Sequence, residues 1–354
     1  MSARYLITGG AGFIGTNVAV RLCEDGARVR VLDDLSGPGS ERNADWLLRQ
    51  YGGRVELLRG SVRDRAAVEQ AVEGVEAVIH LAAQAAVTAS LLDPISDFQV
   101  NALGTLHLLE AVRARESRPA LLFTSTHKVY GALDDVALSV NGRRYRPNDL
   151  HLRMHGVSER RPLDFHGPHG CSKGAADQYV LDYARTYHLP AAVLRAGCIY
   201  GPHQCGDEDQ GWVAHYLTRA MEGEPITLRD GRQVRDLLYV DDLVDALLAA
   251  LGRMDRVAGK AFNVGGGPTN TVSPLELLAL IESGSIHGRR PEVRMDAWRP
   301  ADQRWYVSDT QRFRDATGWA PRYGVPTGVL RLHRWLSEDF AARQPRAVVA
   351  EGTR

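Results

Sequence analysis

Short apolar runs recur along the first 195 residues and are separated by longer amphipathic segments. Such runs predict β-strands, and here they cover Tyr5–Thr8, Val29–Leu32, Val55–Leu58, Ala77–Ala83, Ala120–Ser125 and Ala191–Arg195. The segments between them predict helices that end near Cys23 or cover Arg63–Glu73, Asp97–Ala114 and Ser172–Tyr187. Strands that alternate with helices form a parallel sheet with right-handed crossovers. The expected fold class is therefore α/β with a doubly wound sheet.

The alternation stops near Gly201, and the rest of the chain predicts a smaller α/β unit. Its best-marked helix begins with Ser273 as N-cap, Pro274 at the first position and Glu276 at the third. We expect a first domain over residues 1–195 and a C-terminal domain mainly over 196–340, with about 236–262 returning to the first. Residues 341–354 lack apolar periodicity and are expected to form a flexible tail.

A polar insertion over about 132–166 interrupts the first domain. Loops of this length are uncommon unless they are functional or disordered. The insertion is rich in arginine, with Arg143, Arg144, Arg146, Arg153, Arg160 and Arg161. Two interpretations stay open: a solvated or oligomer-facing loop, or a lid over an anionic substrate.

Composition limits the possible partners. Lys and Arg together number 43 and equal Asp and Glu, so no net charge favours nucleic acid or an anionic membrane. The four cysteines lack CxxC spacing, which argues against a zinc site and against a disulfide framework, and we expect no metal. No apolar run reaches the length of a membrane span, and no signal peptide precedes Arg4, so a cytoplasmic location is expected.

The first strand leads into a glycine-rich turn with Gly9, Gly12 and Gly15. A strand, such a turn and a helix form the pyrophosphate site of dinucleotide-binding proteins, because the helix presents free N–H groups. The acidic pair Asp33 and Asp34 closes the second strand, and Asp33 is placed to accept from a ribose 2′-OH. The sequence therefore predicts a Rossmann domain that binds NAD in preference to NADP.

A second stretch of interest is Gly167–Lys173, in which His169 and Lys173 are four residues apart. In a helix, this spacing places both side chains on one face. A neutral imidazole beside a fixed cation can accept a proton near pH 7. By itself, the stretch also fits a histidine after a loop proline and a solvated helix lysine.

Together, these motifs resemble the extended short-chain dehydrogenases/reductases that act on nucleotide sugars, over about residues 3–335. Within that family they most resemble the CDP-tyvelose (CDP-paratose 2-) epimerase branch. The resemblance is carried by 125–131 (STHKVYG), 163–166 (LDFH), 170–179 (GCSKGAADQY), 209–213 (DQGWV), 233–236 (QVRD) and 302–304 (DQR).

The resemblance implies an NAD-dependent epimerase that transiently oxidises a ring hydroxyl of a nucleotide-diphosphate sugar, at C2 of a CDP-hexose in this branch. It implies Thr126 and Lys173 as catalytic residues, with His169 where the family keeps a tyrosine. A homodimer or homotetramer is expected. Ser61 stands where the family has an aspartate that contacts adenine, so we expect weaker but retained cofactor binding.

The expected contacts divide into two sets. NAD is expected at Gly9, Gly12, Phe13, Ile14, Gly15, Asp33, Asp34, Ser61, Val62, Leu81, Ala82, Ala83, Asn101 and Lys173. The sugar nucleotide is expected at Gln84, Thr88, Thr126, His127, Gln210, Trp212, Arg235 and Arg299. Of these, Arg235 and Arg299 match family positions that bind the pyrophosphate, for which the guanidinium fork is suited.

His169 admits three interpretations. It replaces the tyrosine as acid and base, although its imidazole is shorter than a phenol and proton-transfer geometry decides before pKa does. It marks altered chemistry helped by His166, Cys171 or His203, or it marks a non-catalytic NAD-binding relative. A dehydratase or decarboxylase also begins with hydride removal. Dehydratases of this superfamily carry an Asp-Glu pair after the fifth strand, where this chain has His127 and Lys128.

Overall fold

A computed structural model describes residues 4–207, 210–283, 291–298 and 302–343. Its largest element is a seven-stranded, all-parallel sheet in the order β12-β8-β5-β4-β1-β2-β3. The strands are β1 (Arg4–Thr8), β2 (Arg28–Asp33), β3 (Val55–Arg59), β4 (Ala77–His80), β5 (Ala120–Thr126), β8 (Ala191–Ala196) and β12 (Ala261–Val264). The order reverses between β1 and β4, the switch point of a Rossmann sheet. The predicted α/β class is confirmed.

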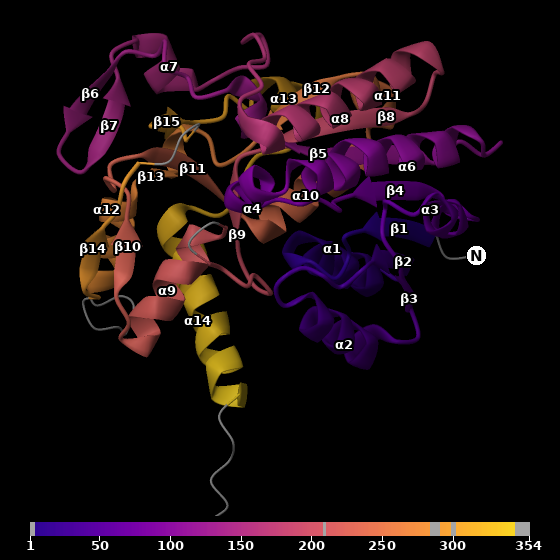
Figure 1. Cartoon of the computed structure of the whole chain (residues 1–354), viewed down its shortest axis with the longest axis horizontal. Coiled ribbons are helices and arrows are strands. Elements are labelled where there is room, and N and C mark those ends of the chain that lie inside the picture. Colours follow the sequence, from indigo (N-terminus) through magenta and orange to yellow (C-terminus); the bar gives the residue numbers. More distant parts are fainter. Residues whose placement is uncertain (1–3, 208–209, 284–290, 299–301, 344–354) are drawn as a thin grey trace, which may run out of the picture.

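Helices cover both faces of this sheet (Figure 1). One face packs against α1 (Phe13–Glu24), α2 (Ser40–Tyr51), α10 (Val240–Leu251), α11 (Met254–Val257) and α13 (Gln311–Thr317). The other packs against α3 (Arg65–Val72), α6 (Gly104–Arg113) and α8 (Gly167–Thr186). The strands other than the edge strand β3 are mostly buried on both sides, which is why their sequences read as apolar runs rather than as alternating patterns.

The helix expected over Asp97–Ala114 is interrupted. It consists of α5 (Pro94–Phe98), a π-helical turn (Gln99–Leu103) and α6, with the short helix α4 (Val87–Leu92) before it. The side chain of Asn101, inside the π turn, bonds to both backbone groups of Gln84 at 3.0 Å. The π turn therefore lies where the helix makes a tertiary contact, and the helical periodicity of the sequence does not predict such a contact.

The smaller unit is built on β11 (Val234–Tyr239), which pairs with β9 (Cys198–Tyr200), β13 (Thr271–Val272) and β15 (Trp305–Tyr306). Around this sheet lie β10 (Ile226–Leu228), β14 (Val293–Met295), a 3₁₀ turn (Pro268–Asn270), α9 (Trp212–Glu222), α12 (Pro274–Glu282) and α14 (Val325–Arg343). The predicted start of α12 is confirmed, because Ser273 and Glu276 form a reciprocal capping box with Pro274 in the first turn. A flexible tail was expected over residues 341–354, but helix α14 continues to Arg343. The rest of that expected tail, residues 344–354, lies outside the described residues.

The insertion folds into a hairpin of β6 (Leu138–Asn141) and β7 (Arg144–Pro147), followed by α7 (Leu150–His155). A 3₁₀ turn (His127–Tyr130) connects β5 to it. The hairpin docks on the smaller unit through Arg144, whose Nε lies 2.6 Å from Glu276 Oε1 and whose Nη1 lies 2.9 Å from Thr271 Oγ1. The structure describes every residue of the insertion. None of them lines the pocket that lies at the carboxyl ends of the parallel strands. This position favours the solvated or oligomer-facing interpretation over the lid.

A buried ion pair fixes α8 on the sheet. Both oxygens of Asp177 on α8 accept from Arg195 on β8, at 2.9 Å each, and both side chains are nearly inaccessible. Arg195 also donates to the hydroxyl of Tyr130 at 3.1 Å. Bidentate pairing of this kind fixes direction as well as distance.

Replacing Asp177 by Ala should leave the guanidinium of Arg195 buried without its counter-charge, at a cost of about 3–5 kcal/mol in unfolding free energy. Denaturant titration measures this cost. The matched control is Asp182→Ala on the same helix, which breaks the exposed pair with Arg185 and should cost at most about 1 kcal/mol. Equal losses in the two variants would contradict the assigned role of the buried pair.

Candidate active site

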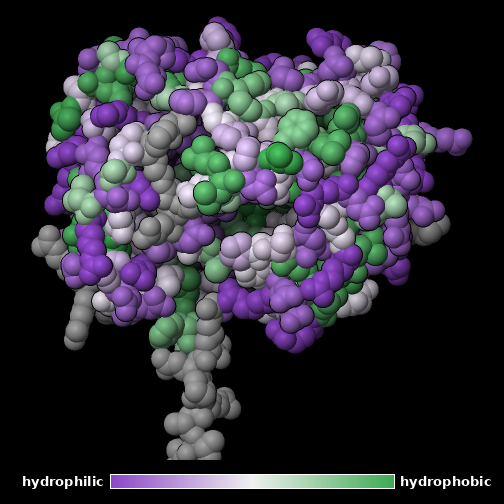
Figure 2. Space-filling model, in the orientation of Figure 1, coloured by the Kyte–Doolittle hydropathy of each residue, from purple (hydrophilic) through white to green (hydrophobic). Residues whose placement is uncertain are grey.

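A pocket of about 480 Å³ lies at the carboxyl ends of β1, β4, β5 and β8, and the smaller unit forms its other wall. In Figure 2, the surface is hollowed near the centre of the view. Ligands of open α/β sheets bind in the crevice at the switch point between strands. Here the crevice runs from Gly9 after β1 and Leu81 after β4 to Trp212 and Arg235 of the smaller unit.

The pocket brings together residues from all three predicted groups. They are Gly9, Gly12, Phe13, Ile14, Gly15, Leu81 and Ala83 of the NAD set, Thr126, His169 and Lys173 of the catalytic set, and His127, Gln210, Trp212 and Arg235 of the substrate set. Asp33, Asp34, Ser61, Val62, Ala82, Gln84, Thr88 and Asn101 do not line it. Arg299 lies outside the described residues.

The glycine turn has the shape of a phosphate cradle. Gly9 has a φ of 68°, and a Cβ at Gly15 would collide with the carbonyl oxygen of Gly9. Helix α1 begins at Phe13 without a side-chain cap, so its first N–H groups are available beside the pocket. These features fit the pyrophosphate of a dinucleotide.

Behind this turn, the buried carboxylate of Asp33 accepts from the backbone N–H groups of Ala11 and Leu35, at 2.9 Å each. Burial raises the pKa of Asp33, although these two hydrogen bonds act to lower it. Asp34 is exposed and accepts from the backbone of Ser36 at 3.1 Å. Its partial burial alone would raise the pKa of Asp34, but hydrogen bonds from Ser36 and Ser61 outweigh this effect and lower the pKa. Asp33 therefore holds the glycine turn. The side chain of Asp34 instead accepts a hydrogen bond from the Ser61 hydroxyl.

Lys173 is buried one helical turn after His169, and both line the pocket, as expected from their spacing. Its ammonium donates to the carbonyl oxygen of Thr124 at 2.7 Å and lies 4.2 Å from the centre of the Phe123 ring. Burial lowers the pKa of Lys173 to about 7, although the carboxylates of Asp177 and Asp97 favour its charged form. Lys173 can therefore change its charge state near neutral pH.

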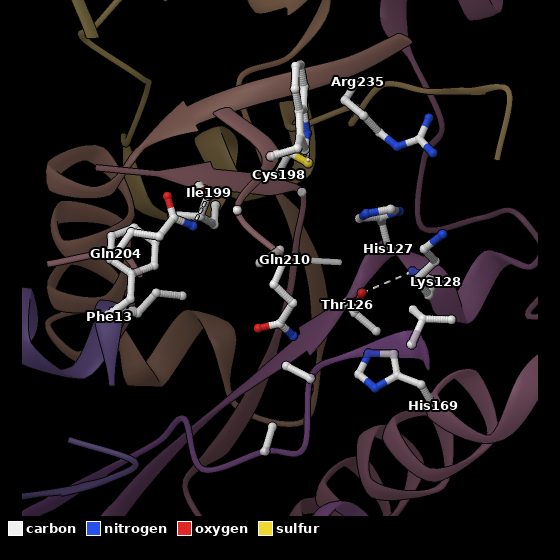
Figure 3. A pocket seen from close by; sticks show the side chains of 18 of the residues that line it. Phe13, Thr126, His127, Lys128, His169, Cys198, Ile199, Gln204, Gln210 and Arg235 are labelled. Atoms are coloured by element: carbon white, nitrogen blue, oxygen red, sulfur yellow. Dashed lines mark hydrogen bonds between the residues drawn. The ribbon is translucent and has the colours of Figure 1, made fainter. Parts of the chain in front are cut away.

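His169 occupies the first turn of α8, after Pro168. Its ring points into the cavity beside Thr126 and Lys128 (Figure 3). Nδ1 lies 3.2 Å from the carbonyl oxygen of Gln84, which leaves Nε2 for a ligand. His166, Cys171 and His203 do not line the pocket. The rings of Trp46 and Trp335 flank His203, at centroid distances of 4.5 and 5.2 Å. Of His169 and these three candidate helpers, only His169 therefore lies in the pocket.

At the far end of the pocket, two cations share one carboxylate oxygen. Oδ1 of Asp302 lies 2.8 Å from Lys128 Nζ and 2.9 Å from Arg235 Nη2. Burial raises the pKa of Asp302, but these cations outweigh it and hold it well below its ordinary value. One carboxylate faces two cations, so the cluster is positive and suits an anionic ligand.

His127 lies beside this cluster. It bonds to Gln303 Oε1 at 2.7 Å and stacks on Tyr306 at 4.5 Å between ring centroids. Burial lowers the pKa of His127 far below its ordinary value, so its ring is neutral. The sequence-based site contained neither Lys128 nor Asp302. In the sequence, both residues appeared only as members of the family motifs. The scarcity of lysine was an available signal, because two of the chain's three lysines line this pocket.

Fold and pocket define the class as a Rossmann dinucleotide-binding protein with a second unit that closes the site. A family model described as the NAD dependent epimerase/dehydratase family matches residues 5–265. The chain belongs to this family, and its cofactor is NAD. The NAD prediction is thereby confirmed.

Three similar proteins illustrate the match. A CDP-paratose 2-epimerase of Salmonella typhi is 38% identical over 343 residues, covering 94% of this chain and 99% of that protein. The solved Thermus thermophilus UDP-glucose 4-epimerase in complex with NAD is 32% identical, with a TM-score of 0.77 and coverage of 94% and 99%. The solved Thermotoga maritima UDP-glucose 4-epimerase with UDP-glucose is 28% identical, with a TM-score of 0.78 and coverage of 95% and 99%.

Among the described residues, no three His, Cys, Asp or Glu side chains gather as metal ligands. No described helix is long and apolar enough to cross a bilayer.

The low pKa of Lys173 predicts a specific dependence of stability on pH. Because the unfolded chain binds more protons than the folded one between pH 7 and 10, native stability should rise with pH in that window relative to Lys173→Met. The relative gain should be on the order of 2–4 kcal/mol. Denaturant titrations of NAD-free protein measure it.

The control is Lys260→Met, since Lys260 is exposed. The difference in unfolding free energy between Lys260→Met and the native protein should stay constant with pH. A constant difference for Lys173→Met as well would show that Lys173 is not held in a desolvated site.

Proposed function

We propose that this chain is an NAD-dependent nucleotide-sugar epimerase that acts at C2 of a CDP-hexose or a related nucleotide-diphosphate sugar. The observation that carries the proposal is the continuity of one pocket. It joins the glycine turn, the group Thr126, His169 and Lys173, and the Lys128–Asp302–Arg235 cluster. A dinucleotide, a sugar and a pyrophosphate can therefore lie in sequence along it.

The cofactor end rests on the glycine turn and on the two aspartates after β2. The N-terminus of α1 receives the pyrophosphate, and the carboxylate of Asp33 or Asp34 accepts from the adenosine ribose. Lys173 binds the nicotinamide ribose hydroxyls, for which its buried ammonium near Thr124 is suited. When bound, NAD takes up a hydride from a sugar carbon and returns it.

His169 removes the proton of the oxidised hydroxyl. Within the described ranges Nε2 makes no hydrogen bond, so the neutral ring offers it as a base. The Thr126 oxygen accepts from the backbone N–H of Lys128 at 3.2 Å. The Thr126 hydroxyl hydrogen can then point to the sugar oxygen. On return of the hydride to the other face, His169 gives its proton back to the oxygen.

The phosphate end supports a nucleotide-diphosphate substrate. Arg235 and Lys128 form its cationic wall, with Arg299 as a further proposed contact. Gln210 and Trp212 line the same pocket and are proposed to contact the nucleotide. The choice of CDP and of C2 rests on the shared motifs and on the similarity to the CDP-paratose 2-epimerase of Salmonella typhi, which is 38% identical.

Two alternatives are weaker. A dehydratase needs acid–base chemistry after β5, where this chain has a neutral His127 and a Lys128 engaged with Asp302. A non-catalytic NAD-binding relative would not need a buried lysine and an imidazole in the same pocket, because burying a cation costs free energy.

We also propose that the chain forms a homodimer or homotetramer. Leu91, Leu92, Ile95 and Phe98 of α4 and α5 are 55–83% exposed. They form an apolar surface beside α8, where Tyr179 is also exposed. Clustered large apolar side chains of this kind mark association sites.

The epimerase proposal is tested with a CDP-hexose that carries deuterium at C2. Because the hydride leaves and returns to one carbon, the C2 epimer should form with its deuterium retained, as measured by NMR. His169→Ala should lower kcat by about 100-fold or more, whereas His166→Ala, at an exposed neighbour, should leave it unchanged. Native activity should fall below about pH 6, where an imidazole ordinarily takes up a proton.

Two outcomes would contradict the proposal. Washout of the deuterium into water would indicate deprotonation at carbon rather than hydride transfer. Lack of turnover with CDP-, UDP- and dTDP-hexoses in NAD-loaded protein would indicate a non-catalytic relative.

Association is measured by light scattering on the native chain and on the double variant Leu92→Asp and Ile95→Asp. The native chain should be dimeric or tetrameric and the variant monomeric, because each added carboxylate would be desolvated in the interface. The control pair Val293→Asp and Met295→Asp, at exposed positions on β14, should keep the native mass. A monomeric native chain would reject the proposal.

A further inference from the structure

A buried polar network lies directly behind His169. Its centre is Asp97, which has no exposed surface and comes from α5, next to the π turn. Oδ1 of Asp97 accepts from Asn101 Nδ2 at 3.1 Å, and Oδ2 accepts from the Ser172 hydroxyl. Ser172 also accepts from Asn101 at 3.0 Å. The carboxylate is therefore oriented by two donors on different helices.

The same carboxylate faces the imidazole. Oδ1 of Asp97 lies 3.8 Å from Nδ1 of His169, and the carbonyl oxygen of Gln84 lies 3.2 Å from that nitrogen. Gln84 is in turn held by Asn101, which bonds to its N–H and its C=O at 3.0 Å. Both groups that face Nδ1 are acceptors, so Nδ1 carries the hydrogen and Nε2 carries the lone pair.

We propose that Asp97 is a positioning residue of the reaction: with the Gln84 carbonyl it keeps His169 in the Nδ1–H tautomer and stabilises the imidazolium formed during turnover. This inference rests on the proposed role of His169 as base. It assigns to the π turn a purpose beyond packing, because Asn101 orients both Asp97 and Gln84 from that turn.

The charges balance in the proton-transfer step. The O–H bond of the sugar breaks, its proton forms a bond to Nε2, and the O–H electron pair becomes the second bond of the ketone as the hydride leaves carbon. The ring then carries one positive charge, and Asp97 is the negative group behind it. Lys173 of α8 and Lys128 after β5 line the same pocket, and as cations both oppose this charge. Asp177 of α8 is paired with Arg195 of β8. A carboxylate at Nδ1 offsets the two lysines, as it does behind other catalytic histidines.

Asp97→Asn tests the proposal because it keeps shape and removes charge. We expect kcat to fall about 10- to 100-fold with KM changed less than about twofold, since the charge acts only after proton transfer. The acidic limb of the pH–rate profile should move about one unit to lower pH, since the imidazolium loses its counter-charge. The control is Ser172→Ala, which removes a hydrogen bond to Asp97 but leaves its charge and should leave the limb in place.

A second measurement needs no turnover. In ¹⁵N-histidine-labelled, NAD-loaded protein, the signals that His169→Ala removes identify the ring among the chain's 12 histidines. We expect the native ring to be protonated at Nδ1 when neutral, and its titration midpoint to move to lower pH in Asp97→Asn. A ring protonated at Nε2, or a midpoint that Asp97→Asn does not move, overturns the inference. Absence of turnover in the native protein instead overturns the proposed function, so the two failures are distinguishable.

Discussion

The site depends on how α8 is held against the sheet, and the bidentate ion pair between Asp177 and Arg195 holds it. Both partners are buried, so neither can leave the other without exposing an unpaired charge to the protein interior. Arg195 extends the contact to Tyr130, whose hydroxyl donates to Asn263 of β12 at 2.8 Å. One ion pair thus connects α8, β8, the turn after β5 and the last strand of the sheet. His169 and Lys173 take their positions from this connection.

Charge is distributed unevenly along the pocket. At the sheet end, the glycine turn and the N-terminus of α1 supply N–H groups for phosphate. In the middle, the imidazole of His169 lies between an acceptor network behind it and Thr126 in front of it. At the far end, Lys128 and Arg235 outnumber the carboxylate that they share. Two ligands match this order: a dinucleotide with its pyrophosphate at the glycine turn, and a sugar nucleotide with its pyrophosphate at the cationic cluster.

Local patterns predicted the sheet well because most of its strands are buried on both faces and therefore stand out as apolar runs. The glycine turn and the spacing of His169 and Lys173 were likewise readable, since backbone freedom and helical period are local properties. The π turn at Asn101 was not readable, because it coincides with contacts to Gln84 and Ser172 that lie 17 and 71 residues away. Asp302 was missed as a site residue for the same reason: its bond to Lys128 spans 174 residues. The lid hypothesis for the insertion could not be settled locally either, since the docking of Arg144 on Glu276 spans 132 residues.

The central claim is that His169 takes the place of a phenolic base without any other residue moving to replace it. A crystal structure with NAD and a bound CDP-hexose tests it most directly. The account predicts that Nε2 of His169 lies about 2.6–3.2 Å from the hydroxyl oxygen of the carbon that faces the nicotinamide, directly or through one water. The Thr126 hydroxyl should contact the same oxygen. A sugar whose reacting hydroxyl contacts another titratable side chain, with His169 out of reach even through a water, would contradict it.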